Sequence, residues 1–300
     1  MSTPVIESKG GAPYGATHVH TTGGTPRMIA TAPVRQARPR TRGLTMVIDS
    51  GMPTGAFTDV IDSHGGLVDL VKFGWGTCLV TRDLSRKLDV LRAAGIDFYF
   101  GGTLFEHHLW SGRLGEFVDL LRTHRVTHVE VSNGTIPLDQ HEKAGYVRLL
   151  AREFTVISEV GFKDAGRSEA LVPTDWVAAM QEDLDAGASL VTAETRESGR
   201  CGMARADGSL RADVLGAVLT AVDPALVLFE APTRSLQVDL IRAAGPDVNL
   251  GNIATGDIVG LETLRLGLRA DTLMDLTPAA PARPLPAAAP LGRGRLTVAA

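Results

Sequence analysis

Four glutamates stand at or next to the ends of short apolar runs in this sequence: Glu130, Glu159, Glu194 and Glu230. Each one alone is a weak signal, because polar residues commonly return where a strand ends. Their recurrence predicts a shared site, since buried carboxylates that face one mouth repel one another unless a cation offsets them. A divalent cation, or nearby lysine and arginine side chains, would offset this negative charge. Oxygen ligands without Cys–His pairs favour Mg²⁺ over zinc.

Basic and small polar residues follow the same pattern. Lys72, Lys163 and Arg196 also come at or just after apolar runs. Arg196 and Lys72 suit a phosphate or carboxylate group, because a guanidinium offers two parallel donors to such a group. Gly251 and Asn252 end the last apolar run, just ahead of a predicted helix. This region often binds phosphate through backbone N–H groups in barrel proteins, so we expect both residues to contact substrate.

Motifs of several other chemistries are missing from the sequence. The segment HEKAG at 141–145 lacks the second histidine of the HExxH zinc motif, and there is no GxSxG nucleophile elbow. The two cysteines, Cys78 and Cys201, cannot form a disulfide framework, which fits a reducing compartment. We interpret Cys201 as incidental. These observations leave the carboxylates and basic residues as the candidate chemistry.

Eight short apolar runs rich in β-branched residues predict the strands that would position these side chains. They are almost continuously apolar, as expected for strands that are covered on both faces. The runs are LTMVI (44–48), LVKF (70–73), IDFYF (96–100), HVEVS (128–132), TVISEV (155–160), LVTAE (190–194), LVLFE (226–230) and VNLGN (248–252).

Helix-like segments lie between the runs, for example at 83–94, 173–186 and 257–268. Eight strand–helix units predict an α/β fold, a single-domain (β/α)₈ TIM barrel, in which catalytic groups project from the carboxyl ends of the strands. The main alternative is an open doubly wound sheet, which usually carries a glycine-rich phosphate loop after its first strand. Here the first run continues into DSGMPTGAF, which is not GxGxxG.

Composition restricts the function classes. The chain has 300 residues, is 44% hydrophobic and 21% charged, and carries a net charge of −4, which gives no support for a nucleic-acid partner. No apolar run is long enough to span a bilayer and no secretion signal is visible, so we expect a cytoplasmic protein without a membrane partner. We predict a flexible basic N-terminal arm over 1–42, a barrel over 43–274 and a Pro/Ala-rich tail over 275–300.

Eight segments, taken in order, resemble the phosphosulfolactate synthase family: VKFGWGT (71–77), GGTLFE (101–106), EVSNGT (130–135), SEVGFKD (158–164), RESG (196–199), FEAP (229–232), VNLGNI (248–253) and LETLRLGLRADTL (261–273). The resemblance covers the whole predicted barrel and leaves out both tails. It implies a (β/α)₈ barrel that adds sulfite to phosphoenolpyruvate in a Mg²⁺-dependent reaction, giving (2R)-2-O-phospho-3-sulfolactate. It also implies a homo-oligomer with a small phosphorylated substrate.

The resemblance implies roles for individual residues. The family's proposed acid lies after the fifth strand, where Lys163 is the nearest match; a lysine whose pKa is lowered by its surroundings would protonate C2 of the substrate. We expect Glu159 and Arg196 to act with Lys163 in catalysis. Two alternatives stay open for Glu159 and Glu194: both are metal ligands or groups that orient the ligands, or both only hold strand ends together through ion pairs. The expected metal ligands are Glu130, Glu194 and Glu230, and the expected substrate-binding residues are Lys72, Thr103, Asn133, Gly251 and Asn252.

Three positions depart from the family pattern. Ser50 and Phe162 stand where the family usually has lysine, and Asn133 stands where it usually has aspartate. Two basic groups and one carboxylate are therefore missing near the expected mouth. The alternatives that stay open are a diverged barrel enzyme that uses another nucleophile or another enol or phosphorylated substrate, and a noncatalytic, stress-related protein.

Overall fold

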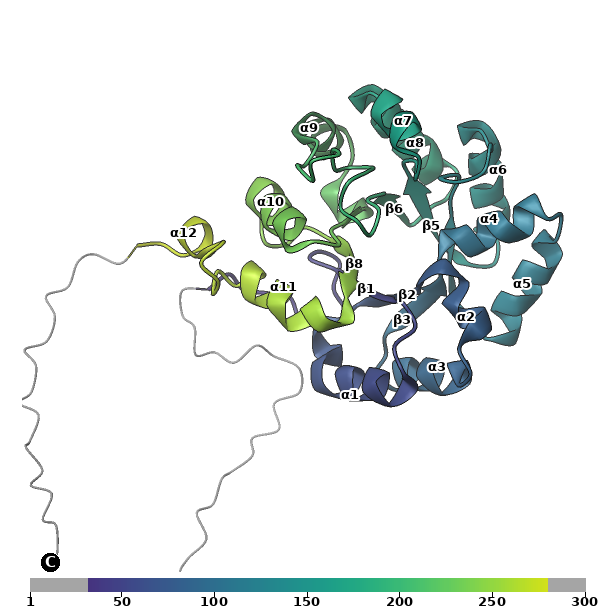
Figure 1. The fold of residues 1–300 in the computed structure, drawn as a ribbon, viewed down its shortest axis with the longest axis horizontal. Helices are drawn as coiled ribbons and strands as arrows, with labels where there is room; N and C mark the ends of the chain where they lie inside the picture. The colour runs from purple at the N-terminus through teal and green to yellow at the C-terminus, as the bar shows by residue number, and fades with distance from the viewer. Residues whose placement is uncertain (1–31, 280–300) are drawn as a thin grey trace, which may run out of the picture.

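Eight parallel strands alternate with helices around a nearly closed barrel in the computed structural model, which describes residues 32–279 (Figure 1). Neighbouring strands pair in the order β3-β2-β1-β8-β7-β6-β5-β4, and β3 also contacts β4. The predicted (β/α)₈ barrel is therefore confirmed. The strands are β1 (Thr45–Asp49), β2 (Leu70–Phe73), β3 (Asp97–Phe100), β4 (His128–Val131), β5 (Thr155–Val160), β6 (Leu190–Ala193), β7 (Val227–Glu230) and β8 (Leu250–Ala254).

Helices cover the outer face of the barrel (Figure 1). They are α1 (Thr54–His64), α2 (Thr77–Val80), α3 (Leu84–Ala93), α4 (Gly102–Trp110), α5 (Leu114–Thr123), α6 (Gln140–Leu150), α7 (Ala165–Ala170), α8 (Pro173–Asp185), α9 (Ala212–Ala221), α10 (Arg234–Ala244), α11 (Ile258–Arg265) and α12 (Leu273–Leu276). Short 3₁₀ turns join several elements: η1 (Gly65–Leu67), η2 (Gly74–Gly76), η3 (Pro224–Leu226) and η4 (Thr255–Asp257).

The helix boundaries follow local signals in the sequence. Pro173 begins α8, where its missing N–H costs no hydrogen bond, and the Asp175 carboxylate accepts a hydrogen bond from the Val172 N–H at 3.0 Å. Gly95 and Gly187 follow the ends of α3 and α8 with positive φ, the backbone conformation that favours glycine there. The helices predicted at 83–94, 173–186 and 257–268 therefore correspond to α3, α8 and α11.

The barrel has two separate apolar cores. A small interior layer consists of Met46, Leu70, Tyr99, Ile157 and Leu228. The larger core lies between the outer face of the strands and the helices, and β-strand alternation explains the division, since successive side chains point to opposite faces. Residues two positions beyond the interior layer therefore point inward as well, nearer the carboxyl ends of the strands.

The last part of the predicted N-terminal arm packs on the amino end of the barrel, whereas residues 1–31 lie outside the described range. The Arg35 side chain is buried and binds Asp247 at 2.8 Å and Glu262 at 3.2 Å. Arg40 binds Asp69, just before β2, at 3.1 Å. Folded structure thus extends before residue 43. The predicted tail lies mostly outside the described residues, but α12 reaches into its start.

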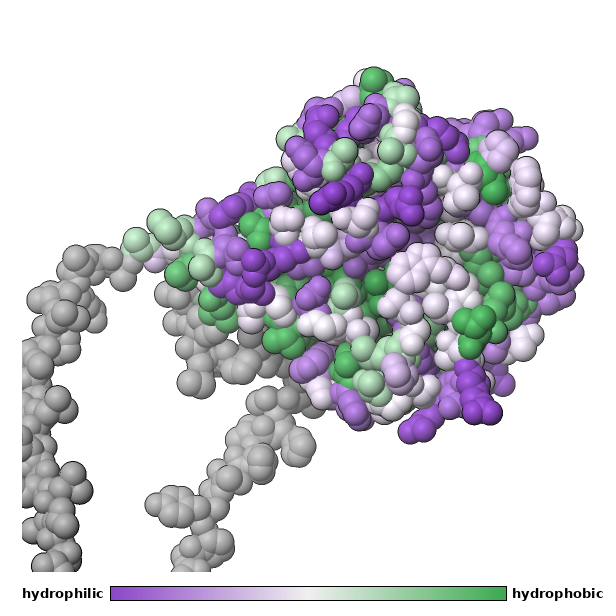
Figure 2. All heavy atoms as spheres, viewed as in Figure 1, coloured by the Kyte–Doolittle hydropathy of each residue, from purple (hydrophilic) through white to green (hydrophobic). Residues whose placement is uncertain are grey.

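The outer surface of the described range is mixed in polarity. On the face shown in Figure 2, hydrophilic and apolar side chains are interspersed over most of the barrel, and apolar side chains gather over α2. Leu79 and Val80 of α2 are among the exposed apolar residues. Between residues 32 and 279, no helix has the length and apolarity that crossing a bilayer requires.

Candidate active site

Lys72 lies at the centre of the carboxyl-end opening of the barrel, which we call the mouth. It follows Leu70 of the interior layer by two residues, so its side chain points into the barrel. Its Nζ donates hydrogen bonds to Glu130 at 3.0 Å, Glu159 at 3.2 Å and Glu230 at 3.1 Å. All four side chains are buried. One ammonium group therefore serves as the shared counter-charge of three carboxylates.

The second lysine of the mouth is Lys163, in the loop after β5. Its Nζ lies 2.6 Å from Glu159 Oε1 and 3.4 Å from Glu194 Oε2. Glu159 follows Ile157 of the interior layer, and Glu194 comes immediately after β6. Glu159 thus bridges Lys163 and Lys72, and links the outer part of the mouth to its floor.

Glu130 lies beside this cluster, with both carboxylate oxygens engaged. It accepts hydrogen bonds from Lys72 and from the backbone N–H of Gly102, the latter at 2.5 Å. Position 102 requires glycine, because a Cβ there would collide with the Ser132 side chain. The close approach of α4 to β4 therefore places a helix-start N–H on Glu130.

Buried ionisable groups in the mouth have shifted pKa values. Burial raises the pKa of Glu194, and the neighbouring Glu159 raises it further; burial also raises the pKa of Glu130 to about 7. Burial alone would raise the pKa of Glu159, but Lys163 and Lys72 outweigh it and hold that pKa low. Burial would lower the pKa of Lys163, yet Glu159 and Glu194 raise it overall. This direction is opposite to the lowered pKa expected from the sequence.

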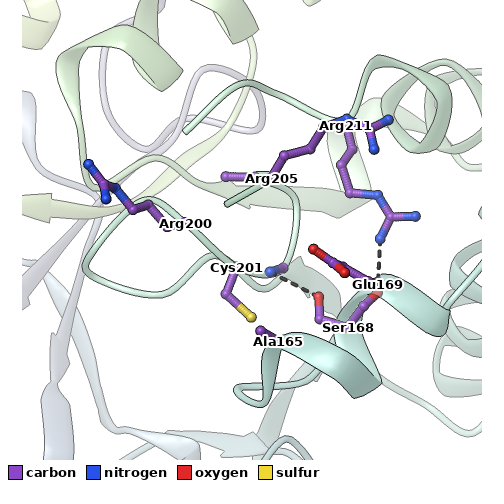
Figure 3. A pocket seen from close by; sticks show the side chains of 9 residues that line it. Ala165, Ser168, Glu169, Arg200, Cys201, Arg205 and Arg211 are labelled. Atoms are coloured by element: carbon purple, nitrogen blue, oxygen red, sulfur yellow. Dashed lines mark hydrogen bonds between the residues drawn. The ribbon is translucent and has the colours of Figure 1, made fainter. Parts of the chain in front are cut away.

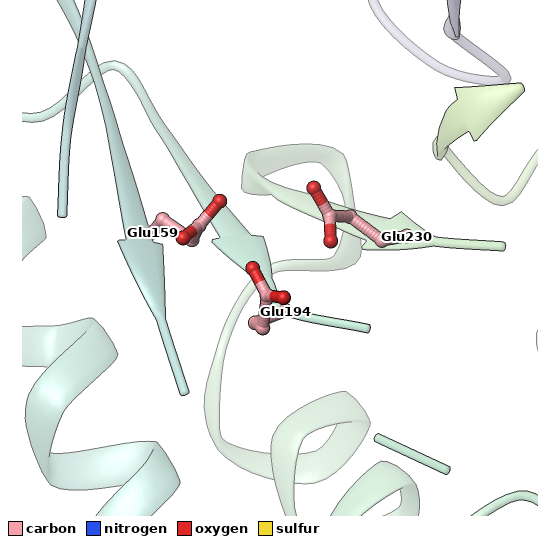
Figure 4. A group of neighbouring side chains, drawn as sticks. All are labelled: Glu159, Glu194 and Glu230. Atoms are coloured by element: carbon pink, nitrogen blue, oxygen red, sulfur yellow. The ribbon is translucent and has the colours of Figure 1, made fainter. Parts of the chain in front are cut away.

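Three of the carboxylates point toward one another (Figure 4). One oxygen from each of Glu159, Glu194 and Glu230 lies within 4.8 Å of the others. With two lysines against four glutamates, two negative charges remain when every group is ionised. The all-oxygen donors and the excess of two negative charges fit Mg²⁺. Glu159, rather than the predicted Glu130, completes this set with Glu194 and Glu230.

Three further predicted residues line the mouth: Thr103, Arg196 and Asn252. The guanidinium of Arg196 is exposed and donates a hydrogen bond to the Lys163 carbonyl oxygen at 3.2 Å. Asn252 has a positive φ of 53°, and its Oδ1 has no hydrogen-bond partner among residues 32–279. These donors and acceptors lie where a ligand in the mouth can contact them.

Two predicted substrate-binding residues do not line the mouth. The Asn133 side chain donates a hydrogen bond to the Leu138 carbonyl oxygen at 3.0 Å and faces a neighbouring cavity between α6, α7 and α8. Gly251 lies below the mouth, where a Cβ would meet Met46 and Leu228 of the interior layer. Gly251 is therefore a packing position in the barrel interior.

Trp75 also lines the mouth, although its position in the sequence did not predict this. It lies in the turn η2 after β2 with a positive φ of 51°, and its side chain is 52% exposed at the mouth. A bulky residue in the left-handed region is uncommon and often marks a functional constraint. Its flanking glycines, Gly74 and Gly76, were the available signal, because they permit the tight turn.

Comparison of the sequence with known proteins shows which family it resembles. The sequence model described as (2R)-phospho-3-sulfolactate synthase matches residues 33–271. A phosphosulfolactate synthase of Bacillus subtilis is 42% identical over 241 residues, which cover 80% of this chain and 96% of that protein. One of Methanothermobacter thermautotrophicus is 40% identical over 245 residues, covering 80% of this chain and 95% of that protein.

A solved structure shows a similar fold at low sequence identity. The Amycolatopsis orientalis BexX/CysO complex contains a chain that matches with a TM-score of 0.50 at 14% identity, covering 84% of this chain and 97% of that chain. This likeness supports the barrel architecture alone.

Proposed function

This chain belongs to the (2R)-phospho-3-sulfolactate synthase family, and from that premise we propose that it adds sulfite to phosphoenolpyruvate to form (2R)-2-O-phospho-3-sulfolactate. The observation that carries the proposal is the mouth itself, where Glu159, Glu194 and Glu230 lie beside Lys72 and Lys163. The family match spans the whole of this arrangement. We assign the enzyme to the lyases that form a carbon–sulfur bond.

The reaction is an addition in which no group leaves. The sulfur lone pair of sulfite forms a bond to C3 of the enol phosphate, and the C2–C3 π electrons move toward C2 and the substrate carboxylate. A proton must then reach C2. The sum of sulfite, phosphoenolpyruvate and one proton equals the product, so the reaction needs neither an oxidant nor a reductant.

Lys163 is the proposed proton donor. Its ammonium group is held by Glu159 at 2.6 Å and its side chain is partly exposed to the mouth, where substrate would lie. Its raised pKa keeps it protonated, and a carbanionic C2 is basic enough to take a proton from an ammonium group. Glu159 therefore has two tasks in this proposal, which are to orient Lys163 and to carry negative charge at the base of the mouth.

The remaining lining residues would bind the anionic substrate. The exposed Arg196 guanidinium offers paired donors to a phosphate or carboxylate, and Thr103 and Asn252 offer hydrogen bonds. Glu159, Glu194 and Glu230 would hold Mg²⁺, which when bound supplies Lewis-acid stabilisation of the charge that develops on the substrate carboxylate.

The test is a product assay with purified full-length protein. Incubation with sulfite, phosphoenolpyruvate and Mg²⁺ should produce phosphosulfolactate, detected by ³¹P NMR and mass spectrometry, and EDTA should abolish it. Lys163→Ala should lower kcat by about 10²–10⁴-fold, the usual worth of a positioned acid. Lys163→Arg is the matched control for charge, because arginine keeps a cation beside Glu159 and Glu194 but replaces the ammonium group with a planar guanidinium of different shape.

Three outcomes would change the assignment. No product at millimolar substrate from a folded protein would contradict it. Turnover of a different enol phosphate without turnover of phosphoenolpyruvate would favour the diverged-enzyme alternative. Full activity in Lys163→Ala would remove Lys163 as the proton donor.

A further inference from the structure

A second polar pocket lies beside α7, on the far side of the loop that follows β6 (Figure 3). Its charged lining residues are Glu169, Arg200, Arg205 and Arg211, and we call it the arginine pocket. It shares no lining residue with the mouth. Three guanidinium groups against one carboxylate give this lining an excess of two positive charges.

Arg211 is the unusual member of this set. The residue is only 7% exposed, and its two terminal nitrogens donate to the carbonyl oxygens of Ser168 at 3.0 Å and Leu171 at 2.7 Å. It forms no ion pair with a carboxylate within the described range, and its Nε has no hydrogen-bond partner there. A buried cation without a counter-ion is costly, so its environment favours a bound anion.

The other charges leave room for such an anion. Arg200 is exposed and forms no ion pair within residues 32–279, and in Figure 3 its side chain points away from Arg211. Arg205 reaches Asp213 at 3.2 Å, but both side chains are about half exposed, so water screens the pair. Glu169 is also exposed and pairs with none of the three arginines in the described chain. Asp213 therefore offsets part of the positive charge of the pocket, and the remainder has no carboxylate partner among the described residues.

The wall of the pocket is fixed by backbone contacts. The Gly202 N–H donates to Ser168 Oγ at 3.0 Å, and Gly202 forms a β-bridge with Thr195. Glycine is required here, because φ is +78° and a Cβ would collide with the Glu194 carbonyl oxygen. The Met203 N–H also donates to that oxygen at 2.8 Å. The segment that carries Arg200 and Arg205 is thus held against the backbone of a mouth carboxylate.

We propose that the arginine pocket is an anion site, separate from the mouth, that takes the phosphate or sulfonate group of a small anion. Guanidinium groups suit tetrahedral oxyanions because their planar donors match two oxygens at once. With Asp213 beside Arg205, one positive charge still remains in excess, which favours an anion. This inference does not rest on the proposed function, since it concerns different residues and is tested by binding alone.

The first experiment measures binding of phosphoglycolate and of sulfoacetate to the full chain by isothermal titration calorimetry. The exposed pair is replaced in Arg200→Ala/Arg205→Ala, and a matched control, Arg86→Ala/Arg148→Ala, removes two exposed arginines from α3 and α6. We expect the pocket variant to bind about tenfold or more weakly, a difference of about 1.4 kcal/mol, and the control to bind as the native chain does. Equal weakening in both double variants, or in neither, would overturn the proposal.

The second experiment separates this pocket from the mouth. Arg196→Ala removes the exposed arginine of the mouth, so anion binding that is lost in this variant and kept in Arg200→Ala/Arg205→Ala would also overturn the proposal. Anomalous scattering from crystals soaked in selenate should give a peak beside Arg211. Weaker binding of sulfoacetate than of phosphoglycolate would identify the phosphate group as the preferred ligand, and the reverse order of affinities would identify the sulfonate group.

Discussion

Lysine is scarce in this chain and occurs where buried carboxylates need a cation. The sequence has five lysines among its 30 basic residues, and four of the five lie within the described range. Each of those four forms an ion pair with a buried carboxylate: Lys72 with Glu130, Glu159 and Glu230, Lys87 with Asp49, Lys143 with Asp183, and Lys163 with Glu159 and Glu194. The contrast between scarce lysine and abundant arginine is visible in the sequence. It indicates the lysines that pair with carboxylates in the mouth and with the buried Asp49 and Asp183.

Lys72 should be essential for the stability of the mouth. Replacing it in Lys72→Met leaves three buried carboxylates without their shared cation, so the free energy of unfolding should fall by about 3–5 kcal/mol. Urea denaturation in EDTA measures this loss. The control is Arg86→Met, which makes a comparable change at an exposed position of α3 and should unfold like the native chain. An unchanged unfolding curve for Lys72→Met would show that the carboxylates do not depend on it.

Glu194 should matter for metal binding more than for folding. Glu194→Gln keeps the shape of the side chain and removes a charge whose burial is unfavourable, so stability in EDTA should not fall. Its affinity for Mg²⁺ should fall about tenfold or more, measured by calorimetry. Glu116→Gln is the matched control, because Glu116 carries the same charge in α5, is exposed and pairs with Arg113. Equal Mg²⁺ affinities in the two variants would contradict the ligand assignment.

Among the elements, the strands were predictable and the loops were not. Seven of the eight predicted runs differ from the strands by at most one residue at either end, because continuous apolar β-branched runs are typical of strands covered on both faces. The last strand begins two residues later than predicted, at Leu250, since the preceding Asn249 uses its side chain to bind Leu44 and Val227. The side-chain amide of Asn249, rather than a neighbouring strand, therefore satisfies the Leu44 N–H and the Val227 carbonyl oxygen.

The same contrast applies to the site. Period-two alternation places Lys72, Glu159 and Glu230 two residues beyond Leu70, Ile157 and Leu228, so their convergence follows from the strands. Alternation does not fix the direction of side chains in loops. It therefore could not predict that the Asn133 side chain donates to the Leu138 carbonyl oxygen instead of facing the mouth. The loop after β2, which carries Trp75, was missed for the same reason.

A buried ion pair between α6 and α8 supports β5. Lys143 binds Asp183 at 2.7 Å and donates to the Glu159 carbonyl oxygen at 2.9 Å. Lys143→Met should destabilise the fold by about 3–5 kcal/mol, because Asp183 is left buried without its cation. The double variant Lys143→Met/Asp183→Leu should lose less than Lys143→Met alone, as denaturant unfolding will measure. A double variant that loses the full sum of the two single effects would show that the pair is not coupled.

Cys78 in α2 should be unreactive in the folded protein. Burial raises the pKa of its thiol to about 12, so at pH 8.5 the folded protein has almost no thiolate, whereas about half of an ordinary cysteine is ionised there. In a Cys201→Ser background, iodoacetamide at pH 8.5 should therefore label Cys78 only after urea is added. Labelling of the native protein at the rate of free cysteine would contradict this expectation.

At the scale of the whole molecule, the amino end of the barrel is closed by the segment before β1. Arg35 binds Asp247 and Glu262 and donates to the Gly43 carbonyl oxygen at 2.8 Å. The family match also begins at residue 33, so this segment belongs to the shared domain. Position 35 therefore joins the first of the described residues to the turn just before β8 and to α11.

Arg35→Ala should weaken the fold without reaching the mouth, which lies at the other end of the barrel. The loss should be at least about 2 kcal/mol, because Glu262 is buried and loses its partner, although the repulsion between Arg35 and the buried Arg265 is relieved. Thermal unfolding measures the loss. Arg42→Ala, at an exposed position nearby, should behave as the native chain does, and equal melting temperatures for the two variants would count against an anchoring role.

The most direct test of the account is a crystal structure of the full chain with Mn²⁺ and phosphoenolpyruvate, in which anomalous scattering locates the metal. We predict a metal peak in the mouth at about 2.0–2.2 Å from oxygens of Glu159, Glu194 and Glu230, with Lys163 Nζ facing C2 of the ligand. A metal that binds elsewhere, or a ligand whose C2 lies out of reach of Lys163, would contradict the account.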